Sequence, residues 1–316
     1  MKNSIQAAIF GHLVGDALGV PVEFRTRESI RLDPVTGMRG FGSHNQPAGT
    51  WSDDGSLMLC LVEAMARGLE LQNLAHRFIA WLDYGHLTAH GDVFDIGNAT
   101  HQAIQSLKRG VAPTSAGGKT ENSNGNGSLM RILPLVFYTR KMLAMDRFKW
   151  TQNVSSLTHA HIRSVAACYY YLEFARILLD HPDKWAAYQA ANESFSLYFS
   201  DRMPGWTESE RKGFQRILSG QLATLPEEAI DGSGYVLHTL EASLWCLLTT
   251  DSYREAVLRA VNLGSDTDTT GAVTGGLAGL LYGYNSIPEE WVAALARREH
   301  IESLVEQLAG VEMPTY

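Results

Sequence analysis

The sequence is poor in cysteine and has no long uninterrupted apolar run. Its three cysteines, Cys60, Cys168 and Cys246, each lie within an apolar helical pattern. Separate buried thiols fit a reducing compartment better than a disulfide framework, so we expect a cytoplasmic protein. No apolar stretch reaches the roughly 18 residues of a membrane span, and we therefore expect no membrane partner.

The most apolar N-terminal segment, IQAAIFGHLVGDALGV (5–20), is interrupted by His12 and Asp16. It lacks the basic start and the small-residue cleavage site of a signal peptide, so we expect a core helix. Basic residues are also scarce: 26 Lys and Arg stand against 34 Asp and Glu, a net charge of -8. This argues against a nucleic-acid partner, since such binding needs clustered Lys and Arg. An anionic substrate must be held by helix N-termini, backbone amides or metal ions.

Helix signals are present almost everywhere in the chain, and strand signals are nearly absent. We therefore predict an all-α fold, a compact multi-helix single domain over residues 1–316, because no composition break marks a boundary. Ser252 and Glu255 predict a capping box, and Gly264 a C-terminal stop. The polar, glycine-rich segment 112–127 is either a linker or a binding loop. The predicted helices cover residues 52–68, 97–109, 128–138, 158–180, 184–199, 208–224, 234–249 and 251–264.

Two segments carry glycine at every fourth residue. They contain Gly11, Gly15 and Gly19, and Gly271, Gly275, Gly279 and Gly283. This spacing places the glycines on one face of a helix, where the missing Cβ atoms allow another backbone to approach closely. Each such glycine costs about 1 kcal/mol relative to alanine, so close packing is the expected compensation.

Two acidic clusters, each with a hydroxyl residue, precede unusually apolar helical segments. They are Ser52, Asp53 and Asp54, and Asp266, Asp268 and Thr269. Carboxylates at a helix N-terminus are often only caps, worth about 0.3–1 kcal/mol through the helix dipole. A cap does not need a pair of carboxylates, however, and two such clusters favour a cation site.

If the clusters meet in space, their charges require neutralisation. Oxygen ligands prefer Mg²⁺ or Mn²⁺, and four carboxylates are enough for two ions about 3.5–4 Å apart. Zinc fits less well, because neither a cysteine nor a suitably spaced histidine pair accompanies the aspartates. His159 and His161 would point to different faces of their predicted helix.

Six segments, in order along nearly the whole chain, resemble the ADP-ribosylglycohydrolases, the family of the dinitrogenase-reductase-activating glycohydrolase and the ADP-ribosyl-arginine hydrolases. They are GDALGVPVEF (15–24), GTWSDDGSLMLCLVEA (49–64), FDIGNAT (94–100), GNGSLMRILPL (125–135), THAH (158–161) and AVNLGSDTDTTGAVTGGLAGLLYG (260–283). The resemblance implies an all-α domain with a central cleft lined by two Mg²⁺ or Mn²⁺ ions.

The resemblance also implies roles for individual residues. The metal ligands would be Ser52, Asp53, Asp54, Asp266, Asp268 and Thr269. Glu23, on a segment that is mobile over the cleft in the family, and Asp95, near the scissile ribose, join Asp54 as candidate catalytic carboxylates. The substrate-binding candidates are Gly125, Asn126, Gly127 and Ser128 for the pyrophosphate, His159 near the same phosphates, and Tyr235. Taken singly, Asp95 could be a helix cap, His159 a packed histidine and Glu23 a surface charge.

The implied reaction is hydrolysis of the glycosidic bond between ADP-ribose and a modified acceptor, with ADP-ribosyl-arginine on protein as the expected linkage. Other linkages stay open: serine, O-acetyl-ADP-ribose, nucleic acid or a small guanidine compound. A non-catalytic ADP-ribose-binding protein is the alternative from another class, because a fold can be reused without its chemistry. Against it, every implied ligand position bears an oxygen donor.

Overall fold

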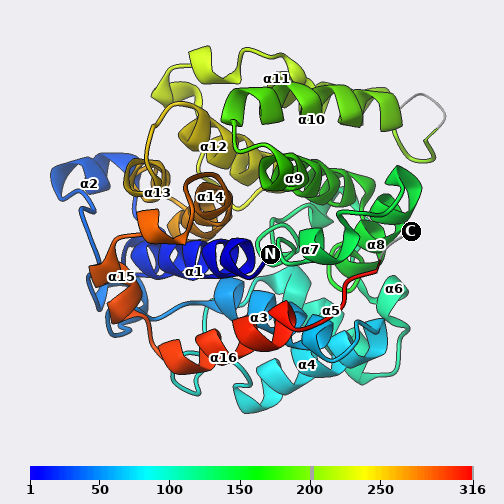
Figure 1. Cartoon of the computed structure of the whole chain (residues 1–316), viewed down its shortest axis with the longest axis horizontal. Coiled ribbons are helices and arrows are strands. Elements are labelled where there is room, and N and C mark those ends of the chain that lie inside the picture. Colours follow the sequence, from blue (N-terminus) through cyan, green and yellow to red (C-terminus); the bar gives the residue numbers. More distant parts are fainter. Residues whose placement is uncertain (200–202, 315–316) are drawn as a thin grey trace.

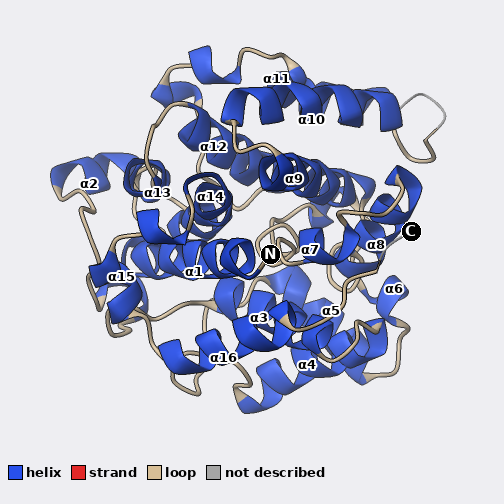
Figure 2. Cartoon of the chain, viewed as in Figure 1, coloured by secondary structure: helices blue, strands red, loops and turns tan. Residues whose placement is uncertain are grey.

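Helices form nearly all of the regular structure in the computed structural model, which describes residues 1–199 and 203–314 (Figures 1 and 2). The described residues contain no strand, so the predicted all-α class is confirmed. The α-helices are α1 (Lys2–Gly19), α2 (Arg27–Leu32), α3 (Asp53–Ala66), α4 (Leu71–Tyr84), α5 (Asn98–Lys108), α6 (Pro113–Ala116), α7 (Leu135–Thr139), α8 (Ala144–Ser155), α9 (Ile162–Asp180), α10 (Lys184–Tyr198), α11 (Glu208–Leu218), α12 (Val236–Leu248), α13 (Tyr253–Val261), α14 (Thr267–Tyr282), α15 (Glu289–Ala294) and α16 (Arg298–Ala309).

Helices α1 and α14 lie side by side in the middle of the molecule (Figure 1). Helices α9, α12 and α13 pack on one side of the pair, and α3 and α16 pack on the other. Helix α1 is the one described helix with the length and apolar composition of a membrane span, and 94% of its apolar window is buried within the structure. This confirms the expected core helix.

The central pair is held at backbone-to-backbone distance by the two glycine stripes. A Cβ atom on Gly15 would overlap the carbonyl oxygen of Gly271, and a Cβ on Gly11 would overlap that of Gly275. At the end of α1, a Cβ on Gly19 would overlap the backbone of Asp268. The predicted close packing is therefore confirmed, and it sets one of the aspartates directly against the end of α1.

Gly283 does not belong to this contact. It follows α14 with a φ of 83° and has open space around its Cα, so it ends the helix. Another prediction was wrong at 128–138, where residues 127–131 form turns and only Leu135–Thr139 is α-helical. Pro134 explains the difference, because it has no N–H to donate and disfavours a helical conformation in Leu133.

The segment 158–161 was also wrongly predicted as helix. Helix α9 begins only at Ile162, with the His161 side chain accepting the Arg163 N–H as a cap (3.2 Å). His159 instead forms an isolated bridge with Gly118. Helices α11 and α13 end earlier than predicted, at Leu218 and Val261, whereas the other predicted helices are found with shifts of a few residues at their ends.

Gly15→Ala tests the glycine contact. We expect the free energy of unfolding to fall by about 3 kcal/mol, because the added methyl group must displace the backbone of α14. Gly310→Ala is the control, since Gly310 has a φ of -80° and only ordinary contacts at 3.6 Å. Urea denaturation should show a change within about 0.5 kcal/mol for the control. Equal stability of the two variants would contradict this account.

Candidate active site

The two predicted acidic clusters meet at neighbouring helix N-termini. They comprise Ser52, Asp53 and Asp54 at the start of α3, and Asp266, Asp268 and Thr269 at the start of α14. The Thr269 hydroxyl donates to Asp54 Oδ2 (3.2 Å), and the Ser52 hydroxyl donates to the same oxygen (3.2 Å). Segments more than 200 residues apart in the chain are thereby joined in one site.

Asp16, in α1, fixes the start of α3 and was not among the predicted site residues. Its fully buried carboxylate accepts the Ser52 N–H at both oxygens (3.0 and 3.1 Å) and the Gly55 N–H at Oδ2 (2.8 Å). Burial raises the pKa of Asp16 to about 7, and these hydrogen bonds oppose the rise. The one signal in the sequence was a carboxylate interrupting an apolar helix, which indicates a buried polar partner but does not identify it.

Three carboxylate oxygens of the clusters are buried without a hydrogen bond: Asp54 Oδ1, Asp266 Oδ1 and Asp268 Oδ2. Leaving a buried acceptor unsatisfied is costly, so each position calls for a partner. One oxygen from each of Glu23, Asp266 and Asp268 also lies within 4.8 Å of the others. An oxygen-only donor set of this kind fits a hard divalent cation such as Mg²⁺ or Mn²⁺.

The electrostatics of the clusters point in the same direction. Burial raises the pKa of Asp53, Asp54 and Asp268 well above the ordinary range, and the neighbouring carboxylates raise it further. Carboxylates packed this closely cannot all ionise without compensating positive charge. A bound divalent cation supplies that charge and reverses the direction of the shifts.

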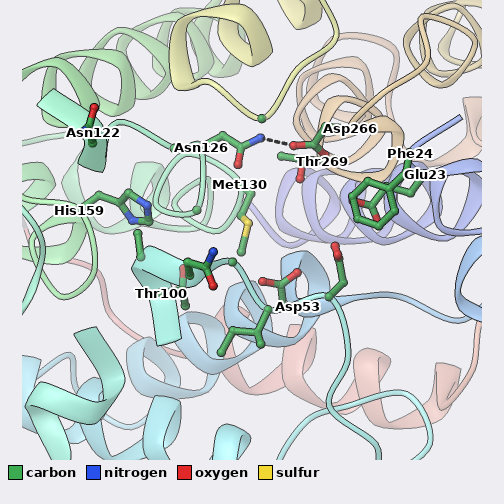
Figure 3. A pocket seen from close by; sticks show the side chains of 18 residues that line it. Glu23, Phe24, Asp53, Thr100, Asn122, Asn126, Met130, His159, Asp266 and Thr269 are labelled. Carbon is green, nitrogen blue, oxygen red and sulfur yellow. Dashed lines mark hydrogen bonds between the residues drawn. The ribbon is translucent and has the colours of Figure 1, made fainter. Parts of the chain in front are cut away.

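A cavity of about 380 Å³ lies over the two helix starts (Figure 3). Ser52, Asp54 and Asp268 are buried and do not line it, and neither do Ser128 and Tyr235. The predicted site residues that do line it are Glu23, Asp53, Asp95, Gly125, Asn126, Gly127, His159, Asp266 and Thr269.

Glu23 and Asp95 lie next to each other, and a histidine that the sequence did not indicate lies close to both. His44 Nε2 pairs with Glu23 Oε2 and lies 3.9 Å from Asp95 Oδ1. Burial raises the pKa of Glu23 to about 11, and the charges of Asp95 and Asp266 add to the rise. The pKa of Asp95 rises to about 6, again mainly through burial. No spacing in the sequence links His44 to either carboxylate, because His44 ends a short 3-10 helix (Gly42–His44) and the two carboxylates lie in separate segments.

The backbone is strained next to these groups. Phe24, Asp95 and Ser265 have φ values of 63°, 56° and 67°, in the left-handed region that non-glycine residues seldom adopt. Two backbone hydrogen bonds join the segment around Phe24 to the segment around Ser265. The Phe24 N–H donates to the Ser265 carbonyl (2.7 Å), and the Ser265 N–H donates to the Arg25 carbonyl (2.8 Å). Glu23 is thus coupled through the backbone to the start of α14. Strain of this kind is typical of functional sites.

Asn126 connects the predicted phosphate loop with the acidic clusters. Its side-chain amide donates to Asp266 Oδ2 (2.8 Å) and to the Thr239 hydroxyl (2.9 Å). Its backbone N–H donates to the Gly234 carbonyl (3.0 Å) and so is already engaged within the protein. The loop was expected to lead into the predicted helix 128–138, but turns follow it instead. Asn126 is therefore a residue that orients Asp266.

His159 lies at the opposite end of the cavity from Glu23 (Figure 3). Its Nδ1 pairs with the Thr158 hydroxyl (2.9 Å), which also accepts a hydrogen bond from Arg131 Nη2 (2.7 Å). Burial, with a further contribution from the charge of Arg131, lowers the pKa of His159 to about 3, so the ring is neutral at physiological pH. The ring also lies directly beside Gly127, where a Cβ atom would collide with it.

Ser128 and Tyr235 take positions outside the cavity. The Ser128 hydroxyl is buried and accepts a hydrogen bond from Ser155 (2.9 Å). The Tyr235 ring lies near the guanidinium of Arg163, whose central carbon is 5.9 Å from the ring centroid. An isolated bridge joins Tyr235 to Gly125, so its backbone supports the loop although its ring does not line the cavity.

Comparisons with known proteins find relatives over nearly the whole chain. The model of the ADP-ribosylglycohydrolase family matches residues 1–315. The chain is 33% identical to the ADP-ribosylarginine hydrolase Tri1 of Serratia proteamaculans (strain 568), over 96% of this chain and 78% of that protein. It is 28% identical to the ADP-ribosyl-[dinitrogen reductase] glycohydrolase of Rhodospirillum rubrum, over 96% of each.

A solved structure, the ADP-ribosylglycohydrolase-related protein complex, superimposes with a TM-score of 0.80 at 30% identity and covers 97% of both chains. The all-α fold is thus shared along nearly the full length of both chains. The chain belongs to the ADP-ribosylglycohydrolase family, whose members hydrolyse a glycosidic bond.

Asp16→Leu tests the anchoring of α3. Leucine has nearly the same shape but accepts no hydrogen bond, so the N–H groups of Ser52 and Gly55 lose their acceptor. We expect the free energy of unfolding to fall by about 2–4 kcal/mol in urea denaturation with chelator present. Asp16→Asn keeps one acceptor and should lose less. Asp251→Asn is the control, because this side chain is 95% exposed and asparagine keeps an oxygen that accepts the hydrogen bond from Lys184. Equal losses in Asp16→Leu and the control would refute the role of Asp16.

Proposed function

We propose that this chain is a Mg²⁺- or Mn²⁺-dependent hydrolase that releases ADP-ribose from ADP-ribosylated arginine on protein. The observation that carries the proposal is the meeting of two acidic helix starts, with three buried carboxylate oxygens that lack a partner, at the border of one cavity. The names of two relatives, an ADP-ribosylarginine hydrolase and an ADP-ribosyl-[dinitrogen reductase] glycohydrolase, support the linkage.

The proposed ligands of two cations are Ser52, Asp53, Asp54, Asp266, Asp268 and Thr269. Cations held there would bind the ribose hydroxyls and lower the pKa of a bound water. Asp16 orients the first group of ligands through the start of α3, and Asn126 orients Asp266 through its side-chain amide. Orientation of ligands by such neighbours commonly changes metal affinity by about 10–100-fold.

Cleavage at ribose C1″ passes through an oxocarbenium-like state and needs a proton transfer at the leaving group or at the attacking water. We assign this transfer to one of Glu23, Asp95 and Asp54. Glu23 and Asp95 line the cavity, where they can contact the substrate, whereas Asp54 lies buried beneath it. The geometry therefore favours the first two over the third.

The pyrophosphate is proposed to lie at the His159 end of the cavity. Among the described residues that line the cavity, none is Lys or Arg, so basic side chains do not supply the attraction. Backbone N–H groups of Gly125, Gly127 and Ser128, together with the neutral His159 ring, are the proposed donors to the phosphates, since the Asn126 N–H is engaged with the Gly234 carbonyl. Tyr235 stays a candidate contact to the ligand. Because its ring does not line the cavity, this contact requires the ligand to extend beyond the cavity.

We further propose that residues 1–316 act as one domain and that the protein works in the cytoplasm, where its three buried cysteines stay reduced. The other linkages named above are rivals within the same reaction class. The preference for one linkage depends on the loops around the cavity. Unlike the proposed metal ligands, these loops are not restricted to particular residue types.

Release of free ADP-ribose from arginine-ADP-ribosylated protein tests the proposal. We expect release with Mg²⁺ or Mn²⁺ and none with excess chelator, because the ribose is fixed by the proposed cations. A panel of arginine, serine and O-acetyl conjugates identifies the linkage. Fast release in chelator would refute metal dependence. Tight binding of ADP-ribose without release from any conjugate would favour the non-catalytic alternative.

Asp268→Asn tests the ligand assignment. Asp268 is fully buried and one of its oxygens has no partner, so the amide should keep the fold but bind cations poorly. We expect kcat to fall by about 100-fold or more, together with loss of Mn²⁺ binding in calorimetry. The exposed Asp251→Asn serves as the matched control. Asp268→Asn with normal turnover and normal Mn²⁺ affinity would overturn the assignment.

A further inference from the structure

We infer that Phe24, supported by His44 and Phe94, forms an aromatic subsite for the planar guanidinium group of the acceptor arginine. The inference rests on the proposed function and specifies how the acceptor side of the substrate is recognised. It concerns residues that neither the cation site nor the phosphate loop uses. The observations that carry it are the position of Phe24, its backbone strain, its ring contacts and the charge around it.

The position of Phe24 in the cavity separates it from the ADP part of the substrate. In Figure 3, Phe24 and Glu23 lie together on one side, and His159 and Asn122 lie on the other. The acidic clusters lie between these two ends. If the ribose is held at the clusters and the pyrophosphate extends toward His159, the group bonded to ribose C1″ must point toward Phe24. This end of the cavity therefore receives the acceptor.

The conformation of Phe24 is costly for the protein and is not explained by packing. Its φ of 63° lies in the left-handed region, and the residue is 70% exposed. Burial of the ring therefore does not compensate for the strain. The backbone hydrogen bonds to Ser265 and from Ser265 to the Arg25 carbonyl hold the residue in place. An exposed aromatic ring in an enforced position, at the lining of a cavity, is arranged for contact with a ligand.

Two further rings support this position. The centroid of the Phe24 ring is 5.7 Å from that of His44, which in turn is 5.1 Å from that of Phe94. His44 is also hydrogen-bonded to Glu23, so one side chain holds both the Phe24 ring and the Glu23 carboxyl group in position. The aromatic face and the acceptor oxygens therefore occupy defined places before the substrate binds.

The chemistry of this end matches a guanidinium group. Such a group is planar, keeps four of its five N–H donors when one nitrogen is bonded to ribose, and stacks on aromatic faces. Glu23 and Asp95, which lie close together and line the cavity with Phe24, offer carboxyl oxygens, and no Lys or Arg is present among the described lining residues to repel a cation. A serine or acetyl acceptor has neither the charge nor the flat surface to use these groups. The subsite thus selects the arginine linkage over neutral ones.

The test measures steady-state kinetics on ADP-ribosyl-agmatine with Mg²⁺, and the Kd of free ADP-ribose by calorimetry. The variants are Phe24→Ala and Phe24→Leu, and Tyr84→Ala removes an aromatic side chain that is 83% exposed and away from the cavity. We expect KM to rise about fivefold in both Phe24 variants, with little change in kcat and with the Kd for ADP-ribose within about twofold of wild type. Tyr84→Ala should match wild type.

Each other outcome contradicts a particular statement. An unchanged KM in Phe24→Ala overturns the subsite, and a normal KM in Phe24→Leu shows that an apolar contact suffices without a ring. A Kd for free ADP-ribose that rises as much as KM places the ring on the ADP-ribose part instead. Wild-type protein that releases no ADP-ribose from the conjugate contradicts the proposed function, and the subsite with it.

Discussion

The backbone contact between α1 and α14 is the constraint on which the site depends. Glycines on both helices let the main chains approach so closely that carbonyl oxygens of one helix occupy the Cβ positions of the other. At the end of this contact, Gly19 lies against Asp268, while Asp16, one turn earlier, holds the start of α3. One rigid helix pair therefore sets the positions of both acidic clusters.

This arrangement concentrates negative charge in a place from which water is largely excluded. Asp53, Asp54 and Asp268 are each almost completely buried, and three carboxylate oxygens of the clusters have no partner. In a protein core such a group is destabilising unless a cation binds there, because buried carboxylates are costly and repel one another. The hydrogen bonds from Ser52 and Thr269 hold one oxygen of Asp54, and the bond from Asn126 holds one oxygen of Asp266, which leaves Oδ1 of each carboxylate without a protein partner.

The sequence predicted the parts of this structure that depend on local pattern. Glycine spacing predicted that a backbone packs closely against each glycine-bearing helix, and the paired aspartates predicted two acidic helix starts. That the two helices pair with each other and that the two starts meet came from the structure. The prediction from sequence failed where a single residue overrode the pattern, as Pro134 did within the predicted helix 128–138. It could not find His44 or Arg131, because their roles come from contacts between separate loops and helices. The sequence showed Asp16 as an unexpected carboxylate in an apolar helix, but it did not show which groups Asp16 contacts.

The most direct test of the central claim is a crystal structure of the protein with Mn²⁺, with data collected at an energy where manganese scatters anomalously. We predict anomalous peaks between the starts of α3 and α14, within coordination distance of Asp54, Asp266 and Asp268. The buried oxygens that have no partner should then be ligands. Manganese-loaded crystals without a peak at this position, or with peaks only at surface carboxylates, would contradict the claim.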